Sequence, residues 1–187
     1  DVSATGDHAV QAIGSKQPIY YLSSLGGKPS LQFDGALSDI GFTTVSLSHN
    51  GWTLVFVVKS TGAGSRGILT DSATVGSNFL YIGTDGVSVS GYSANAVSSA
   101  LWTLPNINNS AKIVQLRGDL VFKLNSQIIT PSVIDNSNTA TTFDTIGWET
   151  DGDTRFQGNI AEVIIYNRNL TDRELNQNYE AFRSRYQ

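Results

Sequence analysis

The stretch "GNIAEVIIYNRNLTDRELNQNYEAF", from Gly158 to Phe182, decides the fold because its character changes halfway along. Its first part, "IAEVIIYN" (160–167), is rich in β-branched and aromatic residues, as strands are. Its second part starts at Thr171 and has Glu174 three residues later, which is the T-x-x-E pattern of a capping box. The stretch therefore predicts a strand that leads into a helix.

The predicted helix is amphipathic. Its apolar residues recur at helical spacing and form one stripe: Leu175, Tyr179, Phe182 and Tyr186. Arg183 and Arg185 lie near its C-terminus, where the helix dipole favours cations. We expect this helix to pack through its stripe on the rest of the protein.

Upstream of this stretch, short apolar or alternating segments are separated by Gly, Asn, Asp and Ser, and no helix is predicted between them. Such a pattern indicates an antiparallel sandwich or barrel. Asp85-Gly86 is a strong hairpin signal, and we expect polar loops at 106–110 and 135–142. The predicted strands are 18–22, 30–35, 52–60, 66–71, 79–84, 86–92, 100–104, 111–118, 120–125, 127–130, 144–148 and 160–167.

The composition excludes several classes of protein. The 187 residues suit a single domain, 1–187. A net charge of −4 argues against nucleic-acid binding, and no apolar run approaches the roughly 20 residues of a membrane span. Without cysteine there is neither a disulfide nor a cysteine metal site. The absence of methionine and the start at Asp1 lead us to expect a piece of a longer protein.

The order of motifs resembles that of the laminin-G-like jelly rolls in the concanavalin A-like lectin/glucanase superfamily. The final strand and capped helix look like the end of such a domain, and the resemblance covers nearly the whole chain. It implies an all-β fold: a two-sheet antiparallel jelly-roll sandwich with a short C-terminal α-helix. The other motifs that carry it are "SATGDHAVQAIGSKQPIY" (3–20), "GGKPSLQFDG" (26–35), "GWTLVFVVKSTG" (51–62) and "TIGWETDGDTRFQG" (145–158).

One departure from the family concerns the start of the chain. Many members carry an additional strand before the first of these motifs, whereas here only Asp1 and Val2 precede it. Either that strand has been removed, or a neighbouring domain or partner chain covers the edge it would leave. An uncovered edge promotes aggregation.

The acidic segment "WETDGDT" contains the nearest match to the carboxylate patterns of related β-glucan-cleaving enzymes. Gly152 and its polar neighbours indicate a hairpin loop, which cannot hold two carboxyl groups at a fixed separation, so we predict no catalysis. The same oxygen ligands suit calcium, giving a candidate metal site at Glu149, Asp151 and Asp153. Glu162 could act as a buried acid, but we favour a salt bridge with an arginine such as Arg168, or a position near solvent.

Three aromatic residues are candidates for stacking on a sugar ring: Tyr92, Trp102 and Trp148. Tyr92 shares its predicted strand face with Ser88 and Ser90, while Trp102 and Trp148 lie at strand ends near polar loops. Aromatic rings offer a large apolar area at low entropic cost. For each ring, packing at the sandwich rim is the competing interpretation.

We therefore predict a non-catalytic carbohydrate-recognition or adhesion module of a larger surface, secreted or phage-appendage protein. Its partner would be a glycan or cell-surface polysaccharide, its location extracellular, at the cell surface or on a virion, and homo-oligomers are compatible with this interpretation. The alternatives are a purely structural spacer or decoration domain, and a glycoside hydrolase or lyase. Fold alone does not choose among them.

Overall fold

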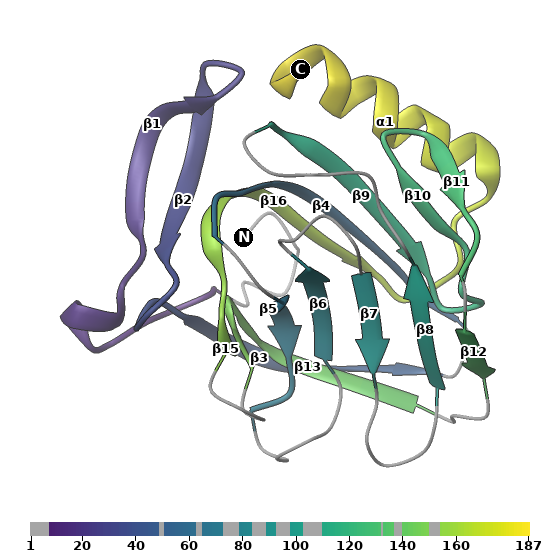
Figure 1. The fold of residues 1–187 in the computed structure, drawn as a ribbon, viewed down its shortest axis with the longest axis horizontal. Coiled ribbons are helices and arrows are strands. Elements are labelled where there is room, and N and C mark those ends of the chain that lie inside the picture. Colours follow the sequence, from purple (N-terminus) through teal and green to yellow (C-terminus); the bar gives the residue numbers. More distant parts are fainter. Residues whose placement is uncertain are drawn as a thin grey trace.

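The computed structural model describes residues 8–48, 51–62, 65–72, 79–83, 89–92, 98–102, 110–131, 133–136, 140–149 and 154–187. Two antiparallel sheets of seven strands and one C-terminal α-helix make up most of this part of the chain. The predicted all-β sandwich is confirmed (Figure 1).

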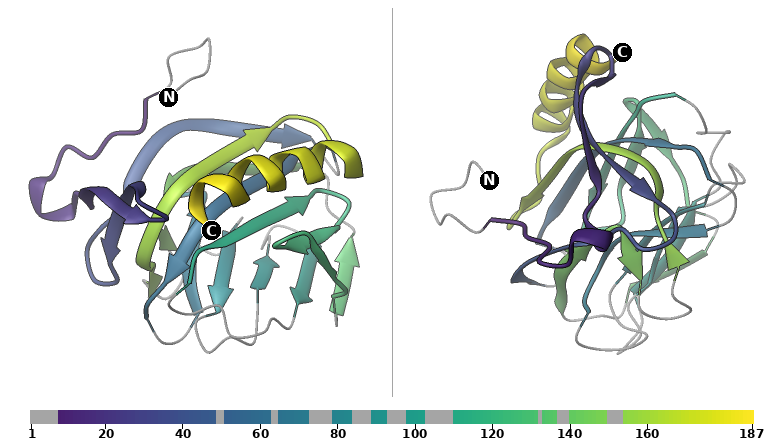
Figure 2. Two further views of the ribbon diagram at one scale, coloured as in Figure 1. Left: turned by 90° about the horizontal axis from the view of Figure 1, so that it is seen from above. Right: turned by 90° about the vertical axis from the view of Figure 1, so that its left-hand side faces the viewer.

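The first sheet carries the helix on its outer face, as Figure 2 shows. Its strands lie in the order β1 (Ile19–Leu25), β2 (Lys28–Asp34), β16 (Gln157–Tyr166), β4 (Thr53–Ser60), β9 (Lys112–Arg117), β10 (Phe122–Leu124) and β11 (Gln127–Ile129).

The second sheet packs against the inner face of the first. Its order is β12 (Val133–Asn136), β8 (Ser98–Trp102), β7 (Val89–Tyr92), β6 (Phe79–Gly83), β5 (Ser65–Thr70), β13 (Ala140–Ile146) and β3 (Ile40–Ser48). A two-stranded ribbon, β14 (Trp148–Glu149) with β15 (Thr154–Arg155), and a short 3-10 helix, η1 (Gly14–Lys16), complete the described elements.

Strand β4 is buried on both faces. Leu54, Phe56 and Val58 belong to the core between the sheets, whereas Val55 and Val57 belong to a second cluster under the helix. All five are fully buried. This double cover explains why the segment reads as a continuous apolar run and not as an alternating one.

Helix α1 (Asp172–Tyr186) forms as the sequence predicts. The Thr171 hydroxyl accepts a hydrogen bond from the Glu174 N–H, and the Glu174 carboxylate accepts one from the Thr171 N–H, which completes the capping box. Leu175, Phe182 and Tyr186 are buried. In the described part of the chain, no helix is long and apolar enough to cross a membrane.

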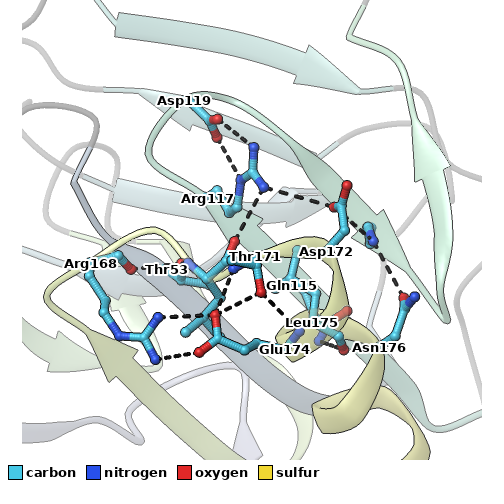
Figure 3. Close-up of polar contacts among 12 residues, drawn as sticks. Thr53, Gln115, Arg117, Asp119, Arg168, Thr171, Asp172, Glu174, Leu175 and Asn176 are labelled. Carbon is cyan, nitrogen blue, oxygen red and sulfur yellow. Dashed lines mark hydrogen bonds and ion pairs between the residues drawn. The ribbon is translucent and has the colours of Figure 1, made fainter.

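Polar contacts fix the start of α1 on the first sheet (Figure 3). The Thr53 hydroxyl donates to the carbonyl of Arg168 at 3.0 Å and accepts from the N–H of Leu170 at 2.9 Å. The buried amide of Gln115 donates to the carbonyl of Leu175 at 2.7 Å. The helix therefore has a fixed position along β4 and β9, because these bonds are directional.

A β-bulge in β16 redirects its side chains. Ile160 pairs with Val58 and Glu162 pairs with Val57, so Ala161 is one extra residue in β16. Ile160 therefore lies in the core between the sheets, while Glu162 lies on the helix side. Strict alternation along the strand would place Ile160 and Glu162 on one face, and the bulge puts them on opposite faces.

Other differences concern polar strands. The sequence does not predict strand β3, because its Thr and Ser residues are exposed at the edge of the second sheet and give no apolar pattern. The segment 135–142 is not wholly a loop: Asn136 ends β12, and Ala140 begins β13 opposite Ser48. The Asp85-Gly86 turn lies outside the described residues.

The β1–β2 hairpin forms an arm that leaves the body of the sheet. Only its base pairs with β16, through residues 31–34 of β2. Its tip reaches the end of α1, as Figures 1 and 2 show. Gly26 has a φ of +56°, and a Cβ added there would lie 2.7 Å from the Cα of Tyr186. Leu25 packs with Phe182 and Tyr186, so the helix supports the arm.

Removing a buried side chain of α1 should destabilise the whole sandwich. Leu175→Ala and Phe182→Ala should each lower the free energy of unfolding by about 2–5 kcal/mol, because each leaves a cavity under the helix. Arg173→Ala, on the exposed side of the helix, should change it by less than about 0.5 kcal/mol. Urea unfolding followed by circular dichroism measures all three. Equal stabilities for the three variants would show that the stripe contributes nothing.

Candidate functional site

The ribbon β14–β15 lies where the chain passes from β13 in the second sheet to β16 in the first. Trp148 and Arg155 are directly opposite each other in this ribbon. The guanidinium carbon of Arg155 lies 4.8 Å from the centre of the Trp148 ring, a cation–π arrangement. Trp148 is half-buried, so part of the residue is accessible to solvent.

Arg155 is held by a buried ion pair. Its Nη1 lies 2.5 Å from a carboxylate oxygen of Asp39, and the two side chains are only 7% and 9% exposed. The same nitrogen donates to the carbonyl of Leu37 at 3.0 Å. A buried pair with added hydrogen bonds fixes the direction of the guanidinium, since breaking it would leave an uncompensated charge.

The N-terminal segment also converges on Asp39. The amide of Gln11 donates to its other carboxylate oxygen and, at 3.3 Å, to its backbone carbonyl. The amide of Gln17 in turn donates to the carbonyl of Gln11 at 2.7 Å. The N-terminal segment is therefore tied to the same ion pair as the tryptophan ribbon.

The loop that carries Asp39 is held by Asp34. One carboxylate oxygen of Asp34 accepts from the backbone N–H groups of Ala36, Leu37 and Ser38, at 2.9–3.0 Å. Burial alone would raise the pKa of Asp34, but these N–H groups hold it well below its usual range. The carboxylate thus stays charged and keeps the Leu37 carbonyl and Asp39 in place for Arg155.

The sequence-predicted residues near this ribbon are only partly described. Glu149 is the strand partner of Thr154, and its side chain lies outside the described part. Asp151 and Asp153 also lie outside it, so the calcium site stays a prediction. Among the residues that the structure describes, no group of three His, Cys, Asp or Glu side chains could hold a metal ion.

Tyr92 and Trp102 are placed by their backbones alone. Tyr92 ends β7 opposite Phe79, and Trp102 ends β8 opposite Val89. The two positions are three steps apart along the ladder, on the order of 10 Å. The register therefore does not place Tyr92 and Trp102 side by side, and Trp148 lies in a different sheet.

Glu162 has a structural environment. Its carboxylate accepts a hydrogen bond from the Tyr186 hydroxyl at 2.7 Å and lies 3.3 Å from Arg185. Burial and the Glu162 carboxylate raise the pKa of Tyr186 to about 12. The expected salt bridge exists, but with Arg185, because the bulge turns Glu162 toward the end of the helix. Arg168 instead pairs with Glu174 at 2.7 Å.

A cleft of about 340 Å³ opens between the arm and the body. Its walls are largely apolar and include Tyr20 and Leu31 from the arm and Ile160 and Val163 from β16. Glu162 lies among the lining residues as well. The cleft exists because β2 separates from β16 beyond Leu31.

The sequence analysis did not identify Arg155 and Asp39 as parts of the rim of the sandwich, the region around the β14–β15 ribbon. A hairpin register for 145–158 would have placed Arg155 opposite Trp148, so this pair could have been predicted from the sequence. Asp39 had none, since it is 116 residues away from Arg155 in the chain.

No protein-family model and no curated protein matches the chain. Several solved structures resemble it in fold at low identity. The receptor-binding domain of botulinum neurotoxin type G has a TM-score of 0.64 at 15% identity, with 96% of this chain covered. The chain spans 48%, about half, of that domain.

Two other similar structures are smaller. Domain 4 of the extracellular arabinanase AbnA from Geobacillus stearothermophilus, in complex with arabinotriose, has a TM-score of 0.59 at 14% identity, covering 86% of this chain and 80% of that one. The carbohydrate-binding module CBM66 from Bacillus subtilis has a TM-score of 0.50 at 12% identity, covering 80% and 91%. At these identities the likeness establishes the fold: the chain shares a β-sandwich with carbohydrate-binding and receptor-binding domains.

A solved enzyme also shares the fold. A sialidase of Trypanosoma rangeli, in complex with the inhibitor DANA, has a TM-score of 0.53 at 13% identity, but the chain covers only 27% of it.

Breaking the buried ion pair should destabilise the rim strongly. Asp39→Asn should lower the free energy of unfolding by about 3–5 kcal/mol, because Arg155 would stay buried without its counter-charge. The double variant Asp39→Asn/Arg155→Met should recover part of that loss. Glu180→Gln breaks an exposed ion pair, in which the side chains of Glu180 and Arg183 are 58% and 55% exposed. It should change the free energy of unfolding by at most about 1 kcal/mol. Equal losses for Asp39→Asn and Glu180→Gln in denaturant titrations would contradict this.

Proposed function

We propose that the chain is a non-catalytic carbohydrate-recognition module of the concanavalin A-like, laminin-G-like type. It would act as one domain, residues 1–187, of a larger surface, secreted or phage-appendage protein. Its partner would be a glycan at a cell surface or in a cell wall, and its location would be extracellular or on a virion. The β-sandwich shared with carbohydrate-binding and receptor-binding domains supports the class of function.

The Trp148–Arg155 pair is the observation on which the proposal depends. A sugar-binding site needs an aromatic ring that keeps its orientation while part of it stays accessible. Trp148 meets this need because Arg155 covers the ring from one side and is itself fixed by Asp39 and Leu37. A pyranose ring could stack on the accessible part of this residue.

Tyr92 and Trp102 remain additional candidates for sugar contact. Their strand positions lie apart from each other and from Trp148, so each ring would serve a separate subsite. A single shallow site with one stacked ring gives millimolar to micromolar affinity, about −4 to −8 kcal/mol. Several copies on one assembly would raise the effective affinity through multivalency.

The two rival functions make different demands on the chain. A structural spacer would bind no glycan at all. A glycoside hydrolase would need two carboxyl groups about 5–10 Å apart, facing each other across a cleft. Glu162 lies at the apolar cleft, but its carboxylate contacts Tyr186 and Arg185. These contacts favour a structural role at the end of α1 over a catalytic one.

Glycan binding should depend on the Trp148 ring. On a multivalent glycan array, Trp148→Ala should weaken binding about 5- to 150-fold, the equivalent of roughly 1–3 kcal/mol of lost apolar contact. Trp148→Phe should retain part of the binding because it keeps a smaller ring. The control variant Ile128→Ala changes a side chain that is 65% exposed on the edge strand β11. It should bind like the wild type.

Two outcomes would overturn this assignment. If wild type binds no glycan on the array, with or without calcium, the structural-spacer interpretation replaces ours. If incubation releases reducing ends and Glu149→Gln stops the release, the chain is an enzyme. Tyr92→Ala and Trp102→Ala, tested in the same way, would locate a site that Trp148→Ala leaves intact.

The proposed calcium site at Glu149, Asp151 and Asp153 has its own test. If the loop binds calcium, EDTA should lower the melting temperature by several degrees, because a bound ion stabilises the folded state by mass action. The Asp151→Asn/Asp153→Asn variant should lose that response, whereas Glu180→Gln should keep it. A melting temperature of the wild type that EDTA does not change would remove calcium from the proposal.

A further inference from the structure

The outer edge of β1 is open. Among the described residues, β1 pairs only with β2, and Figure 1 shows it as the outermost strand of its sheet. The backbone N–H and C=O groups on its free side can therefore pair with another strand. Natural proteins protect such edges by a short strand, a lysine, a proline or a covering segment.

The exposed start of β1, residues 19–22, has no charge, proline or described covering segment, and the irregularity in its register lies after Tyr21. The strand is seven residues long, "IYYLSSL", with neither charge nor proline. By contrast, β11 at the other edge of the same sheet has only three residues. The edge strand β3 is rich in Thr and Ser, and a β-bridge from Val10 to Gly41 covers its start.

The side chains of β1 are unusually exposed for their type. Ile19, Tyr20, Tyr21 and Leu22 are 59%, 60%, 43% and 74% exposed. The chain segment that precedes them adds Val10 and Ile13, at 65% and 53%. Ile19 and Tyr21 lie on one face of the strand and Tyr20 and Leu22 on the other, so a second strand paired along the edge would contact apolar side chains on both faces.

We propose that β1 is a homodimer interface, in which two copies of the chain pair their β1 strands antiparallel about a two-fold axis. A second copy fits because the strand is complementary to itself. It carries no charge that would repel its own copy. A single two-fold rotation also lets the open backbone groups of both β1 strands form hydrogen bonds with each other. The proposal is independent of glycan binding.

Two-fold symmetry requires that one residue of β1 face its own copy, and we place this residue at Tyr20 or Tyr21, in the middle of the exposed apolar run 19–22. If Tyr20 faces Tyr20 of the other copy, Ile19 faces Tyr21. If Tyr21 faces itself, Tyr20 faces Leu22. Each arrangement pairs apolar or aromatic side chains directly across the ladder, where such pairs stabilise a sheet. The first sheet of one copy would then join the first sheet of the other copy to form one continuous sheet.

Sedimentation of the purified chain tests the interface. The wild type should show the mass of two chains, with a dissociation constant in the range of about 1–100 μM, because the interface is of modest size. Leu22→Glu should raise that constant at least tenfold by placing like charges in the ladder. Ile128→Glu, a matched exposed position on β11, should leave the dimer unchanged. Melting temperatures close to that of the wild type would show that both variants fold.

Engineered cysteines identify the strand directly, because the chain contains none. Facing Cα atoms in an antiparallel pair are 4.5–5.5 Å apart, within the span of a disulfide. Either Tyr20→Cys or Tyr21→Cys should therefore form disulfide-linked dimers on mild oxidation at least tenfold faster than Ile128→Cys. A wild type that stays monomeric at 200 μM, a dimer that Leu22→Glu leaves intact, or equal oxidation of the three cysteine variants would each refute the proposal. Glycan binding measured on the monomeric Leu22→Glu variant keeps the two proposals separate.

Discussion

The burial of β4 on both faces is the constraint on which the rest of the structure depends. A strand with Leu54, Phe56 and Val58 on one side and Val55 and Val57 on the other cannot face water on either side. The second sheet covers one face, and in the described part of the chain the helix, with Leu25 of the arm, covers the other. A domain that is otherwise built from strands therefore ends in a helix, whose position Thr53 and Gln115 fix through hydrogen bonds.

The rim of the sandwich depends on contacts between distant parts of the chain. Gln11, Asp39 and Arg155 come together because the segment before β1, the loop after β2 and the ribbon before β16 meet at one end of the sheets. The orientation of Trp148 follows from this meeting point, since its ring rests on Arg155. The candidate site is thus a product of the closed fold, because Asp39, which fixes Arg155 against the ring, comes from a distant part of the chain.

The sequence predicted the parts of this fold that have a local cause. The capping box of Thr171 and Glu174, the stripe from Leu175 to Tyr186 and the apolar run of β4 each carry their own signal. Strand β3 and the bulge at Ala161 do not, because polar edge residues and a one-residue insertion leave no periodic pattern. Of the candidate site, Trp148 was foreseeable as an aromatic residue near a loop. Its fixation by Arg155 and Asp39 was not, because it is a contact across the fold.

The contact between Gly26 and Tyr186 makes the first hairpin depend on the last turn of the helix. Residues 160 positions apart must meet before the arm has its support, which gives the native state contacts of very long sequence separation. During synthesis, the arm therefore stays unsupported until the last turn of α1 has left the ribosome. A chain that stops short of Arg185 would keep most of its strands but would lose the contacts that support the arm. Loss of the last helical turn would therefore first loosen the β1–β2 hairpin, which is near the other end of the sequence.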